Sequence, residues 1–189
     1  RAKDGLSLIN GTSQMCSFLT LSEQRLSNLM VYADMVLCTS IEARQASVTP
    51  ADERVHNARP HQGQLAVSQR IRTLLANSPI MASHADCDQV QDAYSFRCAP
   101  QVHGAVYERY SALQNTLNIE LNSATDNPLV FPDHANPGPH EVVSQGNFHG
   151  EVLALTADSM SAAVFELASI SERRIDQMLD PARSGMPAF

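Results

Sequence analysis

The longest uninterrupted pattern in this sequence runs from residue 12 to residue 41, a stretch that contains neither glycine nor proline. Its apolar residues recur at near-helical spacing: Phe18, Leu21, Leu26, Leu29, Val36 and Leu37. This periodicity predicts one long helix over residues 12–45, which Pro50 and the polar residues around it bring to an end. Because an amphipathic helix of this length must cover its apolar face, the chain is constrained to a fold in which long helices pack together.

Three further segments carry a helical pattern. Residues 62–77 predict a second helix that ends at Ser78-Pro79, and Pro100 starts a long third one, since proline is tolerated in a first turn. Residues 148–179 predict a final helix, roughly 45 Å long at about 1.5 Å per residue. The apolar positions of the third helix are Val102, Val106, Leu113, Leu117 and Leu121, and we interpret them as core.

Two short apolar segments, residues 129–131 and 141–143, flank a turn that contains Pro132, Pro137, Gly138 and Pro139, and this arrangement predicts a β-hairpin. The expected fold is therefore all-α, a long-helix bundle with a short hairpin near residues 129–143. Helices of this length cannot bury their apolar stripes within one small compact domain, so residues 1–189 are expected to be a single helical-bundle segment of a larger subunit. The absence of an initiator Met fits the same interpretation.

Composition excludes several classes of partner. With 43% apolar and 17% charged residues, the chain is typical of a folded soluble protein. The net charge is -7, and only Arg173 and Arg174 are adjacent basic residues, so no nucleic acid is expected. No run approaches the roughly 20 apolar residues of a membrane span, so no membrane is expected either.

The cysteines and histidines do not form a recognisable metal motif. Cys16, Cys38, Cys87 and Cys98 contain no CxxC pair, so we expect neither a disulfide scaffold nor a zinc site. His134 and His140 flank the proline-rich turn, and no His-Glu-x-x-His is present. We therefore expect reduced thiols, a cytoplasmic location and no metal.

Residues 90–98 carry the strongest chemical signal. Gln91, Tyr94 and Arg97 are spaced three apart, so one helical turn would place them on one face. The planar guanidinium of an arginine grips a carboxylate with two parallel charge-assisted bonds. A phenol beside a guanidinium has its anion stabilised and can serve as a general base. The segment is thus a candidate site for an amino or carboxylic acid, although a surface ion-pairing turn fits the same residues.

Three other motifs remain ambiguous from the residues alone. In Leu8-Ile9-Asn10-Gly11-Thr12, the turn could aim the Asn10 amide into a cavity or could simply cap the following helix. The polar residues 122–129 are best explained as the end of the long helix. In Gly146-Asn147-Phe148-His149-Gly150, the phenylalanine could wall a pocket or staple a helix start.

These motifs occur in a fixed order, with Cys98-Ala99-Pro100-Gln101-Val102-His103-Gly104 after the candidate site and Ser171-Glu172-Arg173-Arg174-Ile175 near the end. Taken together, they resemble the aromatic amino acid ammonia-lyases from end to end. The resemblance implies an all-helical homotetramer that removes ammonia non-oxidatively from an L-amino acid, with methylidene-imidazolone as the electrophile. Val102-His103-Gly104-Ala105 favours the branch that converts L-histidine to urocanate in histidine catabolism.

The resemblance also assigns roles to residues. Six positions match the family's active site: Asn10, Gln91, Tyr94, Arg97, Asn147 and Phe148. Tyr94 would be the catalytic base or part of the proton relay, and Arg97 would clamp the substrate carboxylate. Asn10 and Gln91 would lie near the carboxylate and the electrophile, while Phe148, with Asn147 beside it, would pack against the substrate side chain.

Two departures and two alternatives accompany this prediction. The family's electrophile forms from an upstream Ala-Ser-Gly, whereas the nearest string here is Arg183-Ser184-Gly185, so the chain alone is expected to be inactive. Gln145 stands where the family has glycine, and its side chain would narrow the loop or point outward. Tyrosine or phenylalanine ammonia-lyases and the related aminomutases share these motifs. An alternative of another class is a non-catalytic helical assembly module.

Overall fold

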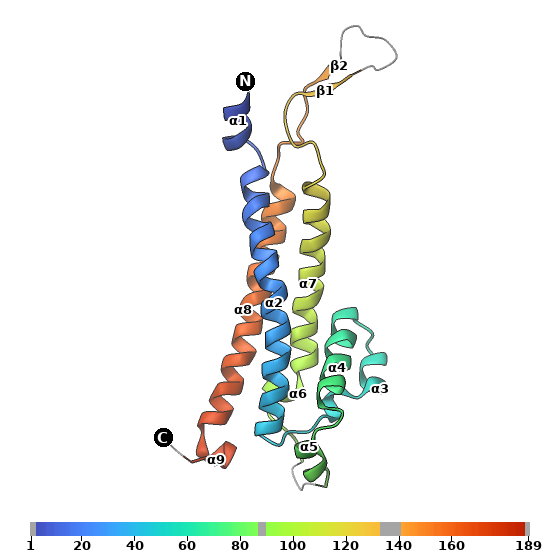
Figure 1. Ribbon diagram of the computed structural model, residues 1–189, viewed down its shortest axis with the longest axis vertical. Coiled ribbons are helices and arrows are strands. Elements are labelled where there is room, and N and C mark those ends of the chain that lie inside the picture. Colours follow the sequence, from blue (N-terminus) through green and yellow to red (C-terminus); the bar gives the residue numbers. More distant parts are fainter. Residues whose placement is uncertain (1–2, 87–89, 133–140, 188–189) are drawn as a thin grey trace. The chain divides into compact units, whose positions relative to one another are not determined.

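The computed structural model describes residues 3–86, 90–132 and 141–187, and the predicted all-α fold with one hairpin is confirmed (Figure 1). The long helices are α2 (Ser13–Ala43), α4 (Gln62–Leu75), α7 (Ala99–Glu120) and α8 (Glu151–Leu179). The short elements are α1 (Asp4–Ile9), η1 (Thr49–Ala51), α3 (Glu53–Asn57), α5 (Pro79–Ser83), α6 (Tyr94–Arg97) and α9 (Pro181–Ser184). The hairpin consists of β1 (Leu129–Phe131) and β2 (Glu141–Val143).

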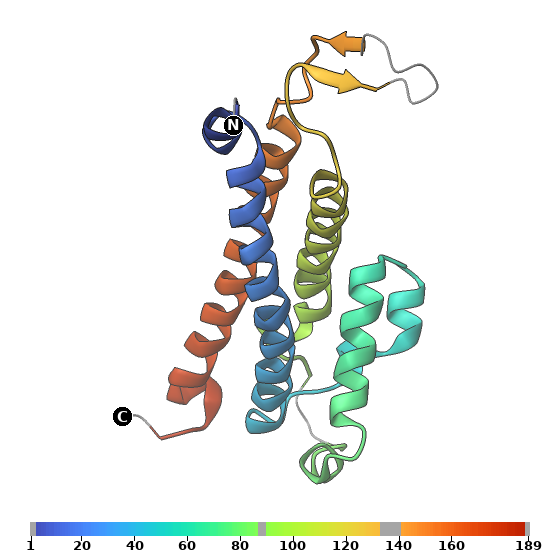
Figure 2. The same ribbon diagram turned by 45° about the horizontal axis from the view of Figure 1, so that its top comes forward.

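The chain divides into two compact units. The hairpin unit consists of Arg1–Arg25 and Ser111–Ser159, and the α4 unit consists of Leu26–Tyr110 and Met160–Phe189. Helices α2, α7 and α8 each contribute one part to either unit, and within each unit these parts lie side by side (Figure 2).

The hairpin unit packs the first part of α2 against the end of α7 and the start of α8. Its buried apolar side chains are Cys16, Leu113, Leu117 and Leu153. In the hairpin, β1 pairs antiparallel with β2, with Leu129 opposite Val143 and Phe131 opposite Glu141. Helix α8 begins at Glu151 rather than at the predicted residue 148, because the preceding Gly146–Gly150 segment forms a turn.

The α4 unit has a core contributed by five helices. Its buried cluster comprises Leu37, Cys38 and Ile41 of α2, Val67, Ile71 and Leu75 of α4, Phe96 of α6, Ala99 of α7 and Ile170 of α8, together with Ala46 and Ala51. Helices α4 and α7 come close together at two glycines, Gly63 and Gly104. A Cβ added to Gly63 would lie 2.0 Å from the carbonyl oxygen of Gly104, so no side chain fits at this crossing.

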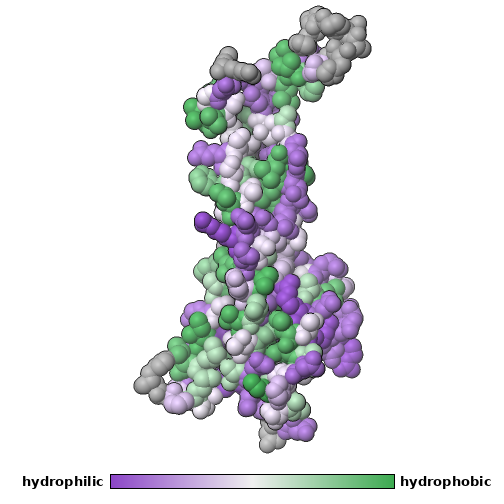
Figure 3. Space-filling view, viewed as in Figure 1, coloured by the Kyte–Doolittle hydropathy of each residue, from purple (hydrophilic) through white to green (hydrophobic). Residues whose placement is uncertain are grey.

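Much of the predicted apolar pattern remains exposed. Of the stripe predicted on α2, Leu37 is fully buried, whereas Phe18 is 63% exposed and Val36 is 58% exposed. Hydrophobic side chains accordingly reach the surface in several places on the face drawn in Figure 3. Among the described residues, α8 is the one helix whose length and hydropathy would allow it to cross a membrane. A helix in the core of a helical bundle can have the same length and hydropathy.

Candidate active site

Helix α6 is a single turn that presents two functional side chains. The backbone amides of Phe96 and Arg97 both donate to the carbonyl of Ala93, at 3.0 Å each. Ser95 and Phe96 are buried, whereas Tyr94 is 74% exposed. The alternation of buried and exposed side chains therefore turns Tyr94 outward and leaves Arg97 half-buried beside it.

Arg97 brings the three predicted residues of this motif together. Its guanidinium donates to Oε1 of Gln91, and its Cζ lies 5.0 Å from the centroid of the Tyr94 ring. Only Tyr94 and Arg97 belong to the helix, since Gln91 lies in the irregular segment before it. The predicted proximity therefore depends on contacts made by Arg97 rather than on helical spacing throughout.

A pocket of about 820 Å³ opens beside Arg97 and Gln91. Its wall combines polar residues with apolar ones: Gln45, Ala46, Ser47, Val48, Thr49, Pro50, Val55, Met81, His84, Ala85, Val90, Asp92, Cys98 and Gln101 also line it. The backbone amide of Ser47 donates to Oδ2 of Asp92 at 2.8 Å, which fixes the segment that carries Gln91. A pocket of this size, mostly apolar with a guanidinium at its edge, suits a small carboxylate-bearing molecule.

The asparagine motif lies in the hairpin unit, in the turn between α1 and α2. Thr12 is buried, and its carbonyl accepts from the amide of Cys16 at 2.9 Å, so it anchors the start of α2. Gly150 comes close to this turn, because a Cβ at Gly150 would lie 3.2 Å from Sδ of Met15. Asn10 itself is exposed at the end of α1.

The polar residues after α7 support the loop that carries Asn147 and Phe148. The Gln145 side chain donates to the carbonyl of Asp126 at 2.6 Å, and its backbone amide donates to Oδ1 of Asn127 at 2.8 Å. The Gln145 side chain also accepts from the backbone amide of Asn147. Gln145, the departure from the family pattern, therefore bonds to Asn147 in its own loop and to the segment after α7 rather than pointing outward.

An ion pair completes this arrangement in the hairpin unit. The Lys3 ammonium donates to Oδ2 of Asp126 at 2.8 Å and to the carbonyl of Asn127, also at 2.8 Å. The hydrogen bond from Lys3 lowers the pKa of the Asp126 carboxyl. The predicted role of the segment in ending the long helix is also visible, since Oγ of Ser123 donates to the carbonyl of Ile119 at 2.6 Å.

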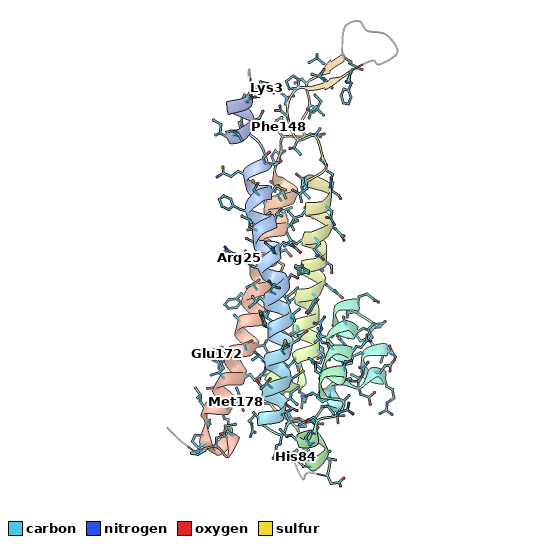
Figure 4. The ribbon with its side chains drawn as sticks, viewed as in Figure 1. Lys3, Arg25, His84, Phe148, Glu172 and Met178 are labelled. Carbon is cyan, nitrogen blue, oxygen red and sulfur yellow. The ribbon has the colours of Figure 1, made fainter. Side chains whose placement is uncertain are left out.

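The six predicted site residues thus fall into two groups of three. Asn10, Asn147 and Phe148 belong to the hairpin unit, where Phe148 is 46% exposed and lies just before α8 (Figure 4). The other group consists of Gln91, Tyr94 and Arg97, in the α4 unit.

A buried polar network in the α4 unit was not predicted. The carboxylate of Asp34 accepts from Nδ1 of His103 at 2.7 Å and from Arg70, which also donates to the hydroxyl of Tyr107. Burial, followed by the nearby negative charge of Asp34, raises the pKa of Tyr107 to about 12. Arg174, only 2% exposed, contacts His103 from α8.

The described residues contain no cluster of three or more His, Cys, Asp or Glu side chains able to hold a metal ion. Cys16, Cys38 and Cys98 are free thiols. Cys87, His134 and His140 lie outside the described residues.

Comparisons with known proteins place this geometry in a family. A family model described as aromatic amino acid lyase matches residues 1–189. Histidine ammonia-lyase of Sorangium cellulosum is 47% identical over 189 residues, which cover 100% of this chain and 37% of that protein. The Homo sapiens histidine ammonia-lyase is 45% identical over 193 residues, covering 100% of this chain and 29% of that protein.

Solved structures give the same result. The crystal structure of histidine ammonia-lyase from Trypanosoma cruzi superposes with a TM-score of 0.79 at 42% identity, covering 98% of this chain and 33% of that one. Tyrosine aminomutase from Streptomyces globisporus gives a TM-score of 0.88 at 34% identity, covering 100% of this chain and 39% of that one. The chain spans 37% and 29% of the length of the two curated relatives named above. With its whole length matched by the family model, the chain belongs to the aromatic amino acid lyase family.

Proposed function

We propose that the complete protein containing this chain is a histidine ammonia-lyase, which eliminates ammonia from L-histidine to give urocanate. The observation that carries this proposal is the Gln91–Tyr94–Arg97 group, in which the guanidinium of Arg97 lies beside the exposed phenol of Tyr94 and also lines a pocket together with Gln91. The similarity to relatives named histidine ammonia-lyase, at 47% and 45% identity, supports the choice of substrate.

The chemistry needs a base for a weakly acidic proton on the substrate β-carbon. Tyr94 is the proposed base, because its ring lies under the Arg97 guanidinium and its side chain is open to a ligand. Arg97 would bind the substrate carboxylate and so orient the β-hydrogen toward the phenol oxygen. Gln91 would hold Arg97 in place through the bond to its Oε1.

The proposed electrophile is the family's methylidene-imidazolone, which makes the substrate amine a better leaving group. Asn10 suits a place beside this group, since its exposed amide has no side-chain hydrogen bond among the residues that the structure describes. Phe148, with Asn147 next to it, would pack against the substrate side chain, and the bonds of Gln145 would keep their loop in position.

The proposed assembly is a homotetramer, in which helices of neighbouring subunits cover the exposed apolar positions. Phe18 on α2 and Phe165 on α8 are 63% and 67% exposed in this chain, and large apolar side chains of this kind mark surfaces that other segments or subunits cover. The free thiols of the described cysteines fit a reducing cytoplasmic location, which we also propose.

The test replaces Tyr94 with phenylalanine in the complete protein. Removing the general base is expected to lower kcat by about 100-fold or more while L-histidine still binds, because only the hydroxyl is lost. Tyr32→Phe, which removes another exposed hydroxyl from α2, is the matched control and should leave kcat unchanged. A Tyr94→Phe enzyme that keeps more than about a tenth of the wild-type kcat would remove Tyr94 from this role.

The substrate is tested by assaying L-histidine and L-tyrosine side by side. Urocanate from histidine alone supports the proposal, whereas coumarate from tyrosine would favour a tyrosine-specific member of the family. The exposed apolar helices also suit a non-catalytic assembly module. In that case analytical ultracentrifugation would show association, and neither amino acid would be consumed.

A further inference from the structure

Helix α6 is too short to hold itself in place. Its four residues make one turn, and a single turn in water is unstable without tertiary contacts. Its exposed side carries Tyr94, so the position of that residue depends on what holds the buried side. Two buried residues make those contacts, Ser95 through its carbonyl and Phe96 through its ring.

Arg174 of α8 contacts both residues, although Phe96 also belongs to the buried apolar cluster of this unit. Its Nε donates to the carbonyl oxygen of Ser95 at 3.2 Å, and its Cζ lies 6.0 Å from the centroid of the Phe96 ring. This guanidinium is 2% exposed, and desolvation lowers its pKa to about 10, which still leaves it charged at neutral pH. The bond reaches the carbonyl group of Ser95, the residue that follows Tyr94.

Arg174 is held in turn by a chain of hydrogen bonds across the core. Its Nη2 lies 3.4 Å from Nε2 of His103, whose Nδ1 lies 2.7 Å from Oδ1 of Asp34. Because a guanidinium only donates, Nε2 is the acceptor in this contact, and Nδ1 then donates to Asp34. Asp34 is fully buried and receives a second bond from Arg70 of α4. The chain therefore connects α6 to α2, α4, α7 and α8.

Such a chain is an inefficient way to stabilise a core. Desolvating a guanidinium and a carboxylate costs free energy that their attraction only partly returns, and apolar residues of similar volume often stabilise as well. The charged groups add geometric specificity, because each charge-assisted hydrogen bond fixes the position of one particular atom. The atom fixed at the end of this chain is the carbonyl oxygen of Ser95, the residue after Tyr94.

We propose that Arg174, anchored through His103 to Asp34, is a positioning residue that holds α6 in the orientation required for Tyr94 and Arg97 to act. The catalytic part of this proposal depends on the function proposed above, whereas the structural part does not. The sequence motif Ser171-Glu172-Arg173-Arg174-Ile175 acquires a role through its fourth residue, whose neighbour Arg173 is exposed and pairs with Glu172.

The structural part is tested by hydrogen exchange on the complete protein with Arg174→Met. Methionine fills the space without donating, so the anchor of α6 is lost, and the Ser95 carbonyl and Nε2 of His103 are left unpaired, which lowers overall stability. We expect the amides of Phe96, Arg97 and Cys98, measured in one peptide, to exchange on the order of 10-fold faster, as for the loss of one hydrogen bond from a charged group. Arg173→Met is the matched control and should exchange as the wild type does. Equal exchange in the two variants would overturn the proposal.

The catalytic part is tested with the same variants at a temperature well below their melting points. Arg174→Met is expected to lower kcat for L-histidine by about 10- to 100-fold, because a misplacement of about 1 Å can cost on the order of 100-fold. Arg174→Lys, which keeps the positive charge but lacks the planar fork of donors, should recover part of the loss. A merely stabilising Arg174 would lower the melting temperature and leave kcat unchanged, and that result would overturn the positioning role.

If Arg174→Met does not fold, His103→Asn tests the positioning role of Arg174 instead. Asparagine can still donate to Asp34 but does not reach Arg174, so only the anchor is broken. Faster exchange in α6 with a lower kcat supports the proposal, and wild-type values for both contradict it. A wild-type protein that releases no urocanate would refute the proposed function alone, since the exchange measurement does not depend on turnover.

Discussion

Gly104→Ala adds one methyl group at the place where α7 crosses α4. The new Cβ would lie 2.5 Å from the amide nitrogen of Gln64 and 2.8 Å from the carbonyl carbon of Gly63. Ordinary contacts between such atoms are about 3.5 Å, so the two helices must separate by about 1 Å. Because the contacted atoms are backbone, no change of side-chain rotamer can relieve the overlap.

The expected cost follows from two opposing effects. Overpacking a well-packed core costs about 1–3 kcal/mol, and a contact with rigid backbone belongs at the upper end of that range. Alanine is better than glycine in a helix interior by about 1 kcal/mol, which offsets part of the loss. We therefore expect a net destabilisation of about 2 kcal/mol and a corresponding fall in Tm.

Thermal unfolding of the complete protein, followed by circular dichroism, measures this effect. Gly5→Ala is the control, because Gly5 lies in helix α1 with nothing within 4 Å of the added Cβ. The control should keep or slightly raise the Tm. If Gly104→Ala, like the control, had a Tm equal to or above that of the wild type, the close approach of α4 and α7 would be refuted.

Three other predictions concern charge and burial. Arg97→Ala should raise KM for L-histidine by about 10- to 100-fold through loss of charge-assisted bonds to the carboxylate, and an unchanged KM would exclude Arg97 from binding. Hydrogen bonds from Arg54 lower the pKa of Asp52, the cap of α3, to about 2. A carboxyl with a depressed pKa contributes stability above its unfolded value of about 3.9, so wild type and Asp52→Asn should differ in Tm above about pH 4 and converge as the pH falls to about 2. Burial raises the pKa of the Cys38 thiol to about 11, so iodoacetamide at pH 8 should label the half-buried Cys98 before Cys38, as mass spectrometry would show; equal rates at these two thiols would contradict this.

The long elements could be predicted because their signals are local. Apolar spacing and the absence of helix breakers defined α2 and α4 to within two residues at either end. Helices α1, α3, α5 and α9 were not predicted, because elements of four to six residues depend on tertiary contacts rather than on their own propensity. Periodicity also identified the apolar stripe of α2 but could not tell that Phe18 is exposed while Leu37 is buried.

In the candidate site, too, the features set by local sequence could be predicted and those set by distant contacts could not. Tyr94 and Arg97 are three residues apart, so their proximity was visible in the sequence, as was the turn that carries Asn10. Asp34 and Arg174 gave no such signal, because a single charged residue in a helix is most often on its solvent face. Their partners in the structure are 69 and 71 residues away, a separation at which no local pattern operates.

The hydrogen bond between Arg174 and Ser95 also sets an order of events during synthesis. The two residues are 79 positions apart, and the donor is the later of the two. At about 5–20 residues per second, a ribosome needs roughly 4–16 s to add the arginine after the serine. During that interval the nascent α6 has no guanidinium to fix it, so the turn that carries Tyr94 acquires its final orientation only after most of α8 has been translated.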